Sequence, residues 1–156
     1  YWIVYSSYAS NLVDNDTNDV ADIFLYNMTT GITTRVSMTN DNQQANQQSL
    51  NPQISEDAKY IVFESDASNL VKNDINGSRD IFLRIFTNPP AAPVGTFCVT
   101  VNSKGEKLKG DSFHPSIGTD GNYNYITYAS DAANVVADDT DHFTDIYVQV
   151  RKGLFQ

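Results

Sequence analysis

The 156-residue sequence has little of several residue types on which common kinds of site depend. Its single cysteine, Cys98, excludes an intrachain disulfide and a metal cage built from cysteines alone. Positive charge is also scarce: 10 Lys and Arg stand against 19 Asp and Glu, which gives a net charge of −9 and argues against a nucleic-acid partner. No apolar run approaches the roughly 18 residues of a membrane span. The shortage of basic clusters also argues against an anionic membrane surface as partner.

Residues that favour helices are few as well. The acids comprise 16 Asp but only 3 Glu, and 16 Asn accompany them. Asp and Asn prefer caps and turns because their short side chains bond to nearby backbone groups. Nine Tyr and eight Phe suit strands, and no stretch carries apolar residues at helical spacing. The composition predicts an all-β protein of short strands joined by turns rich in Asp and Asn.

The sequence contains an internal repeat. Three segments align without gaps: YASNLVDNDTNDVADIFL from Tyr8, DASNLVKNDINGSRDIFL from Asp66 and DAANVVADDTDHFTDIYV from Asp131. The match continues upstream in WIVYSS, YIVFES and YITYAS, which begin at Trp2, Tyr60 and Tyr125. Since chance does not produce three such blocks, the repeat predicts three copies of one structural unit.

Each copy predicts four short antiparallel strands. The first follows a proline, the second alternates, the third has the form Asp-Ile-Phe-Leu, and the fourth is rich in β-branched residues. On the second strand we expect Tyr60, Val62 and Glu64 on one face and Ile61, Phe63 and Ser65 on the other. The predicted ranges are Gln53–Ser55 and Ser116–Gly118 for the first strand, Asp22–Tyr26, Asp80–Ile85 and Asp145–Val150 for the third, and Thr33–Ser37 and Thr96–Val101 for the fourth. Four such strands in about 60 residues are typical of one β-propeller blade.

The repeat also predicts the domain organisation. We expect residues 1–156 to form a single β-propeller segment, with a partial blade at 1–50, a complete blade at 51–113 and a partial blade at 114–156. Three blades do not close a ring, because propellers typically have four to eight. The remaining blades therefore belong either to a longer chain or to further copies in a homo-oligomer. We favour the longer chain because the partial blades at the two ends do not complete each other in an obvious way.

The repeated motifs resemble the TolB-like, WD-type propeller repeats of bacterial envelope and secreted proteins. The Ser-Pro-Asp-Gly turn of that family corresponds here to Ser55-Glu56-Asp57-Ala58 and to Gly118-Thr119-Asp120-Gly121, both without the proline. Its Asp-Ile-Tyr/Phe strand corresponds to the segments that begin at Asp22, Asp80 and Asp145. The resemblance covers almost the whole chain and implies a β-propeller used mostly for binding and scaffolding.

The loop before each third strand repeats a pattern of oxygen-bearing side chains that could bind calcium. Calcium takes six to eight oxygen ligands in flexible geometry. The first copy has a further carboxylate, Asp14. The alternative interpretation is structural, because an Asp at a loop-to-strand junction can hold the loop by accepting backbone N–H bonds without a metal. The candidate ligands are Asp14, Asp16, Asn18 and Asp22; Asp74, Asn76 and Asp80; and Asp139, Asp141 and Asp145.

Catalytic motifs are absent from the sequence. The two histidines, His114 and His142, fall at turn positions, and no nucleophile elbow, metalloprotease helix or phosphate-cradling loop is present. Asp57 and Asp120 occupy equivalent turns in different copies, so we expect them to lie far apart. The prediction is therefore a non-enzymatic binding or scaffold module, secreted or periplasmic, that contacts a protein partner or the remaining blades. The alternatives are a lectin-like propeller that binds a glycan and the propeller part of a larger hydrolase.

Overall fold

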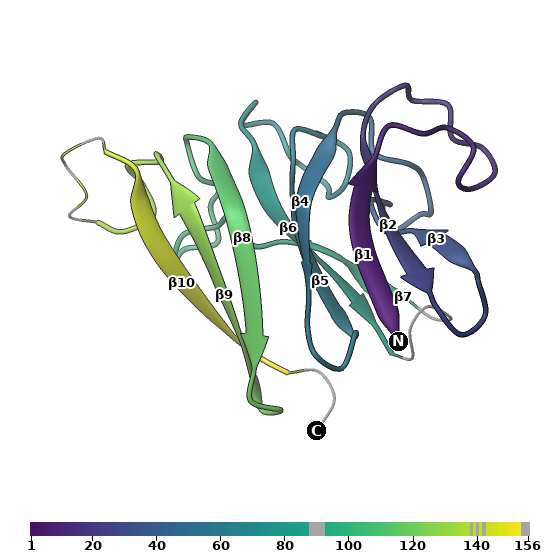
Figure 1. Cartoon of the computed structure of the whole chain (residues 1–156). Coiled ribbons are helices and arrows are strands. Elements are labelled where there is room, and N and C mark those ends of the chain that lie inside the picture. Colours follow the sequence, from purple (N-terminus) through teal and green to yellow (C-terminus); the bar gives the residue numbers. More distant parts are fainter. Residues whose placement is uncertain (88–92, 138, 140, 142, 154–156) are drawn as a thin grey trace.

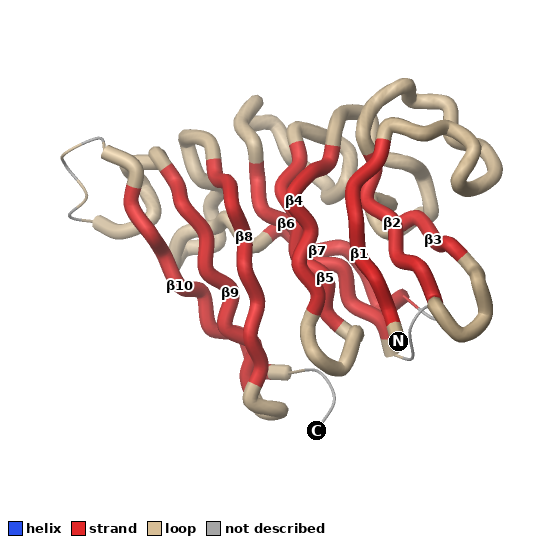
Figure 2. The backbone as a smooth tube through the Cα atoms, viewed as in Figure 1, coloured by secondary structure: helices blue, strands red, loops and turns tan. Residues whose placement is uncertain are grey.

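The computed structural model describes residues 1–87, 93–137, 139, 141 and 143–153. These residues form ten strands and no helix (Figures 1 and 2). The strands are β1 (Trp2–Ser7), β2 (Asp22–Asn27), β3 (Thr33–Arg35), β4 (Ser49–Ile54), β5 (Tyr60–Ser65), β6 (Asp80–Phe86), β7 (Pro93–Cys98), β8 (Ser112–Thr119), β9 (Tyr123–Ser130) and β10 (Asp145–Lys152). They make three antiparallel sheets, which we call sheet 1 (β1–β2–β3), sheet 2 (β4–β5–β6–β7) and sheet 3 (β8–β9–β10).

Each sheet corresponds to one copy of the sequence repeat, and the strand register is conserved among the three. An aromatic pair occupies the same cross-strand position in every sheet: Tyr5 opposite Phe24, Phe63 opposite Phe82 and Tyr128 opposite Tyr147. The ring centroids lie 5.8, 5.9 and 5.9 Å apart. Such pairs stabilise a sheet beyond the area they bury. The predicted repeat is therefore a structural repeat.

Sheet 2 lies between the other two, and both of its faces are buried. Residues of β5 alternate as predicted: Ile61 and Phe63 pack toward sheet 1, whereas Tyr60 and Val62 pack toward sheet 3. Every residue of β5 and β6 is buried. Two separate cores result, one on each side of sheet 2.

The first strand of a sheet begins earlier than the sequence predicted. β4 starts at Ser49 and β8 at Ser112, so Pro52 and Pro115 lie inside the strands and not ahead of them. The pairing register shifts at both prolines, between Leu50 and Gln53 and between Phe113 and Ser116. The residues before the prolines, Asn51 and His114, have φ of 49° and 53°. A β-bulge accommodates a proline that would otherwise interrupt the ladder.

The last strands of sheets 1 and 2 differ from the predicted ranges: β3 is shorter than predicted, and β7 begins and ends earlier. β3 ends at Arg35, and β7 runs from Pro93 to Cys98. The remaining β-branched residues continue into short hairpins, each closed by an isolated bridge: Met38 to Gln44 after β3, and Val101 to Lys107 after β7. These hairpins return the chain toward the acidic loop of the same sheet, and the hairpin after β7 positions Lys107, which is described next.

Candidate functional site

The first acidic loop, before β2, closes around an arginine. Arg35 Nη2 lies 3.4 Å from Asp16 Oδ1, and Arg35 Nε lies 3.6 Å from Asp22 Oδ2. Asn18 Nδ2 donates to Asp22 Oδ2 at 3.0 Å, and Ser37 Oγ donates to the other Asp22 oxygen. Burial raises the pKa of Asp22 despite these partners. The carboxylates of Asp16 and Asp22 are therefore turned inward, and a cation of the chain itself balances them.

The second loop, before β6, has the same arrangement with a lysine in place of the arginine. Lys107 Nζ lies 3.2 Å from Asp74 Oδ2 and 3.0 Å from Asp80 Oδ2. Asn76 Nδ2 donates to Asp80 Oδ2 at 3.2 Å, as Asn18 does in the first loop. Lys107 comes from the hairpin after β7, whereas Arg35 is the last residue of β3. In sheet 1 the cation comes from the last strand, β3, and in sheet 2 it comes from the hairpin that follows the last strand, β7.

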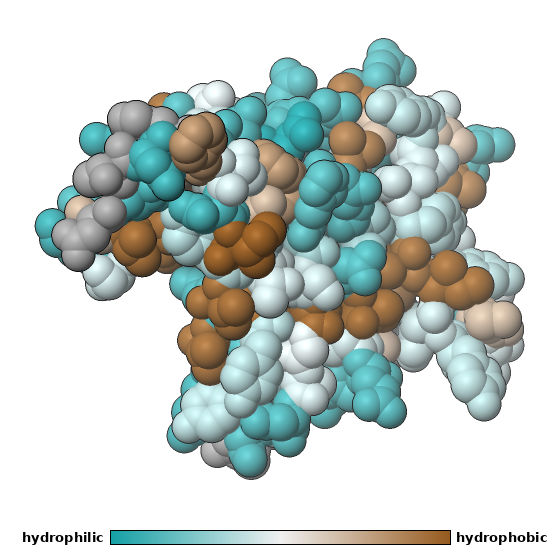
Figure 3. All heavy atoms as spheres, turned by 60° about the vertical axis from the view of Figure 1, so that its left-hand side comes forward, coloured by the Kyte–Doolittle hydropathy of each residue, from teal (hydrophilic) through white to brown (hydrophobic). Residues whose placement is uncertain are grey.

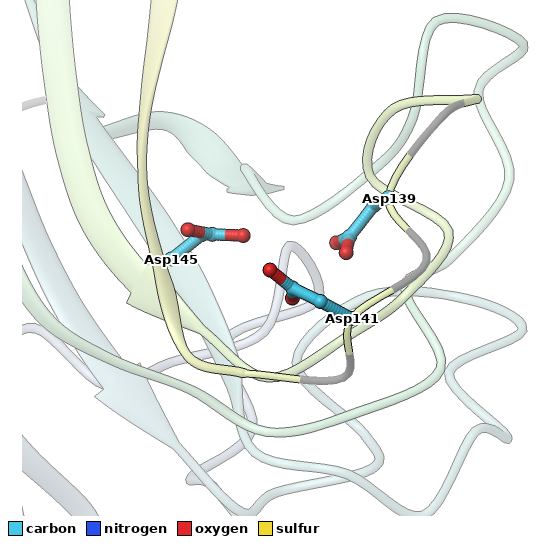
Figure 4. Close-up of side chains that lie close together, drawn as sticks. All are labelled: Asp139, Asp141 and Asp145. Carbon is cyan, nitrogen blue, oxygen red and sulfur yellow. The ribbon is translucent and has the colours of Figure 1, made fainter.

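The third loop, before β10, brings three carboxylates together without such a cation. Oxygens of Asp139, Asp141 and Asp145 all lie within 4.8 Å of one another (Figure 4). Asp139 Oδ2 accepts a 2.8 Å hydrogen bond from Tyr147 Oη, and Asp141 Oδ1 accepts one from the Phe143 N–H. Within the described part of the chain, no ion pair joins these aspartates to a lysine or arginine.

Calcium at these loops stays a prediction, but the geometry now separates the three candidates. In the first two, a side-chain cation occupies the space between the carboxylates that a metal ion would need. The third loop offers three converging carboxylates, of which Asp141 and Asp145 are exposed. Asp14, the proposed extra ligand of the first loop, is itself exposed and lines a cleft of about 640 Å³ that also includes Thr17 and Arg35.

The two turn aspartates lie closer together than the sequence suggested. Asp57 and Asp120 line one cleft of about 650 Å³ between the β4–β5 and β8–β9 turns, so the expectation that they lie far apart was wrong. The reason is that equivalent turns of adjacent packed sheets become neighbours. Each carboxylate holds its own turn: Asp57 accepts from Ser55 and from the Lys59 N–H, and Asp120 accepts from the Asn122 and Tyr123 N–H groups.

These contacts do not resemble an acid–base pair. Backbone hydrogen bonds from Tyr123 and Asn122 lower the pKa of Asp120, whereas a general acid near neutral pH needs a raised pKa. The His114 N–H donates to Glu64 Oε2 at 2.8 Å, and its ring packs edge-on against Phe113. His142 lies outside the described residues. Burial raises the pKa of the Cys98 thiol, which favours the unreactive protonated form.

The surface feature that the sequence did not reveal is the outward side of sheet 3. Five large side chains are exposed there, and we call them the open face. They are Tyr123 (44% exposed), Tyr125 (39%), Ile146 (73%), Val148 (59%) and Val150 (54%). Figure 3 turns this side of the molecule forward and shows apolar side chains gathered on it. In sheet 2 the repeat equivalents of the last three are Ile81, Leu83 and Ile85, which are 0%, 1% and 4% exposed.

Comparison with known proteins gives no independent assignment. No protein-family model matches the chain, and no curated protein matches it either. In the described residues there is no helix of the length and hydropathy needed to cross a membrane.

Proposed function

We propose that the chain is a non-catalytic module of the β-propeller type, which binds a protein partner or serves as a structural subunit of an envelope or extracellular assembly. The observation that carries the proposal is the open face of sheet 3. Single exposed apolar residues are ordinary on a protein surface, but contiguous patches mark sites of interaction. Here the five residues are contiguous because β9 and β10 pair directly, with Val150 opposite Tyr125 and Lys152 opposite Tyr123.

The arrangement of the sheets supports the propeller part of the proposal. Three sheets with the same strand order pack face to face, and the first strands β4 and β8 contact one another across the sheets. Blades of a propeller pack in this way around a common axis. Binding rather than catalysis is supported by three ionisable side chains that line the clefts, Arg35, Asp57 and Asp120, because they are engaged in turns and ion pairs within the fold.

Site-specific photo-crosslinking tests the proposal. A photoreactive residue is placed at Val148 on the open face and, as a matched control, at Ile75, which is 91% exposed in the β5–β6 loop. In extracts of cells that make the protein, the open face should give protein adducts well above those from position 75. Equal yields from both positions would show that the face is no more a binding surface than an ordinary loop, and would refute the proposal.

A further inference from the structure

The chain builds the same kind of sheet-to-sheet interface twice. At each internal contact the preceding sheet presents aliphatic residues, Ile23 and Leu25 from sheet 1 or Ile81, Leu83 and Ile85 from sheet 2. The following sheet presents its aromatic pair, Phe63 with Phe82 or Tyr128 with Tyr147. The interface therefore has a polarity: mainly aliphatic residues, together with Trp2 or Tyr60, on one side, and an aromatic pair on the other.

Each terminal sheet keeps one half of this interface unmatched among the described residues. Sheet 3 presents the aliphatic half, Ile146, Val148 and Val150, on its open face. In sheet 1, Trp2, Val4, Ile23 and Leu25 pack toward sheet 2, so the alternation of β1 and β2 directs the aromatic half to the opposite side. On that outer face Phe24 is buried within the single chain, Tyr5 and Tyr26 are partly exposed, and Ile3 is exposed. Ile3 is 45% exposed, whereas its repeat equivalent in sheet 2, Ile61, is completely buried.

We propose that the open face of sheet 3 binds the outer face of sheet 1 of a second copy of this chain. The inference rests on the proposed function, since it names the partner of the same open face. The new contact would continue the internal interfaces without a change of side-chain chemistry. Two chains bring six sheets together, a number within the four to eight of closed propellers. Two identical head-to-tail contacts would then close a ring, and an unpaired apolar face would remain on neither chain.

Sedimentation of the purified full chain over a range of concentrations tests this contact. We expect a reversible species with twice the mass of one chain. Glutamate at a buried apolar contact is costly because its charge is left unpaired, so Val148→Glu or Ile3→Glu should raise the dissociation constant about a hundredfold or more. Ile75→Glu, in the exposed loop, should leave it unchanged. A melting curve of each variant confirms that the single chain is still folded.

Mixing the two variants tests the polarity of the contact. Neither Val148→Glu nor Ile3→Glu can associate with itself, because each chain lacks one half of both contacts in the ring. Together they retain one intact contact, between sheet 3 of the Ile3→Glu chain and sheet 1 of the Val148→Glu chain. The mixture should therefore form a one-to-one complex, although each variant alone sediments as a monomer.

Three results would overturn the inference. A wild-type chain that stays monomeric at all accessible concentrations has no such contact. A dimer that Ile3→Glu leaves intact does not use the outer face of sheet 1, and a species that keeps growing with concentration does not close into a two-chain ring. If the purified chain is monomeric while position 148 still yields adducts with another protein, the proposed function survives and only the second copy is excluded as partner.

Discussion

At the scale of single residues, buried carboxylates are the feature that needs an explanation. Asp22 and Asp80 are completely buried, and isolated charges at such positions are costly. The chain satisfies them with one cation per loop and with hydroxyl donors, Ser37 in the first loop and Thr100 in the second. The repeated aspartates of sheets 1 and 2 are thus parts of an internal ion-pair network, and the cation holds two segments of each sheet together.

Lys107→Met should therefore destabilise the fold strongly. Methionine fills a similar volume but leaves Asp74 and Asp80 without their cation, and breaking a buried pair from one side costs about 3 kcal/mol. Lys107→Arg keeps the charge and should cost less than Lys107→Met, although the larger guanidinium must fit where an ammonium now lies. Urea unfolding at neutral pH measures both. Equal losses in the two variants would show that packing of the side chain, and not its charge, sets the effect.

The ion pair between Asp66 and Arg79 gives a prediction that depends on pH. Arg79 Nε and Nη2 donate to the two oxygens of Asp66 at 2.8 and 3.1 Å, and these hydrogen bonds lower the pKa of Asp66 below its usual 3.8. A carboxylate with a lowered pKa in the folded state stabilises the fold above its unfolded pKa, and this stability is lost as the pH falls through the folded value. Asp66→Asn should thus cost about 1 kcal/mol at pH 7, because both partners are partly exposed.

At about pH 2 that difference should be smaller, which urea unfolding at the two pH values would show. Asp131→Asn is the matched control: Asp131 holds the same repeat position in sheet 3, where Thr144 replaces the arginine. It should change the free energy of unfolding by less than about 0.5 kcal/mol at either pH. A loss in Asp66→Asn that does not vary between pH 7 and pH 2 would contradict the assigned pKa direction.

At the scale of strands and loops, the prolines of β4 and β8 show how the fold tolerates residues that disrupt a ladder. In each strand the residue before the proline adopts a left-handed conformation, and the pairing register shifts across it. Asn tolerates this conformation better than most residues because its short polar side chain bonds locally. The bulge re-aims the first strand, which lies where adjacent sheets meet. Its backbone geometry is therefore part of the sheet packing.

Asn51→Val should destabilise the fold by about 1–2 kcal/mol, because a β-branched residue is strained at a φ of 49°. Asn51→Gly should be neutral to slightly stabilising, since glycine adopts positive φ without steric cost. The side chain is exposed, so neither change disturbs a core. Thermal or urea unfolding gives the comparison. If valine and glycine have the same effect, the left-handed conformation at Asn51 is not maintained in solution.

The three acidic loops make different predictions for calcium. A ligand that binds only the folded state raises stability by about 2.7 kcal/mol at a hundredfold excess over its dissociation constant. Because Arg35 and Lys107 fill the first two loops, any calcium-specific rise should come from the third. Melting curves after EDTA treatment, with calcium and with magnesium, should show that Asp141→Asn abolishes the rise and that Asp16→Asn retains it.

If Asp16→Asn abolished the calcium-specific rise and Asp141→Asn retained it, calcium would bind at the first loop, which would contradict the role of the ion pairs seen there. Absence of any calcium-specific shift would assign the third set of aspartates to the turn-holding role. In that case Tyr147 and the Phe143 N–H, which already bond to Asp139 and Asp141, are the contacts that matter in this loop.

Much of the architecture can be predicted from the sequence, because strand alternation and repeat alignment are local. The two faces of Tyr60–Ser65 and the three repeat units follow from spacing alone. The β-bulges at Pro52 and Pro115 cannot be predicted in this way, because a proline can mark the start of a strand as readily as an interruption within it. The cations of the acidic loops cannot be predicted from the sequence either. Lys107 is distant in sequence from Asp74, and only the return of the hairpin after β7 brings the two side chains together.

At the scale of the whole molecule, the same repeat position has opposite surroundings in different sheets. Leu83 and Val148 are equivalent in sequence, yet Leu83 is buried between sheets 2 and 3 while Val148 is 59% exposed. Exposure is therefore set by which sheet packs next, and not by the residue or its strand. This is why alignment of the repeats predicts a core position for both residues and only the assembled structure separates them.

The pair provides a direct measure of that difference. Leu83→Ala removes a side chain from a packed core and should cost about 3 kcal/mol, including the cavity that remains. Val148→Ala should cost less than about 1 kcal/mol in a dilute solution of single chains, since it loses strand propensity but little buried area. Urea unfolding at low protein concentration compares the two, and at high concentration Val148→Ala should become more costly if two chains share the interface proposed above. Comparable losses under dilute conditions would mean that the single chain already covers the open face.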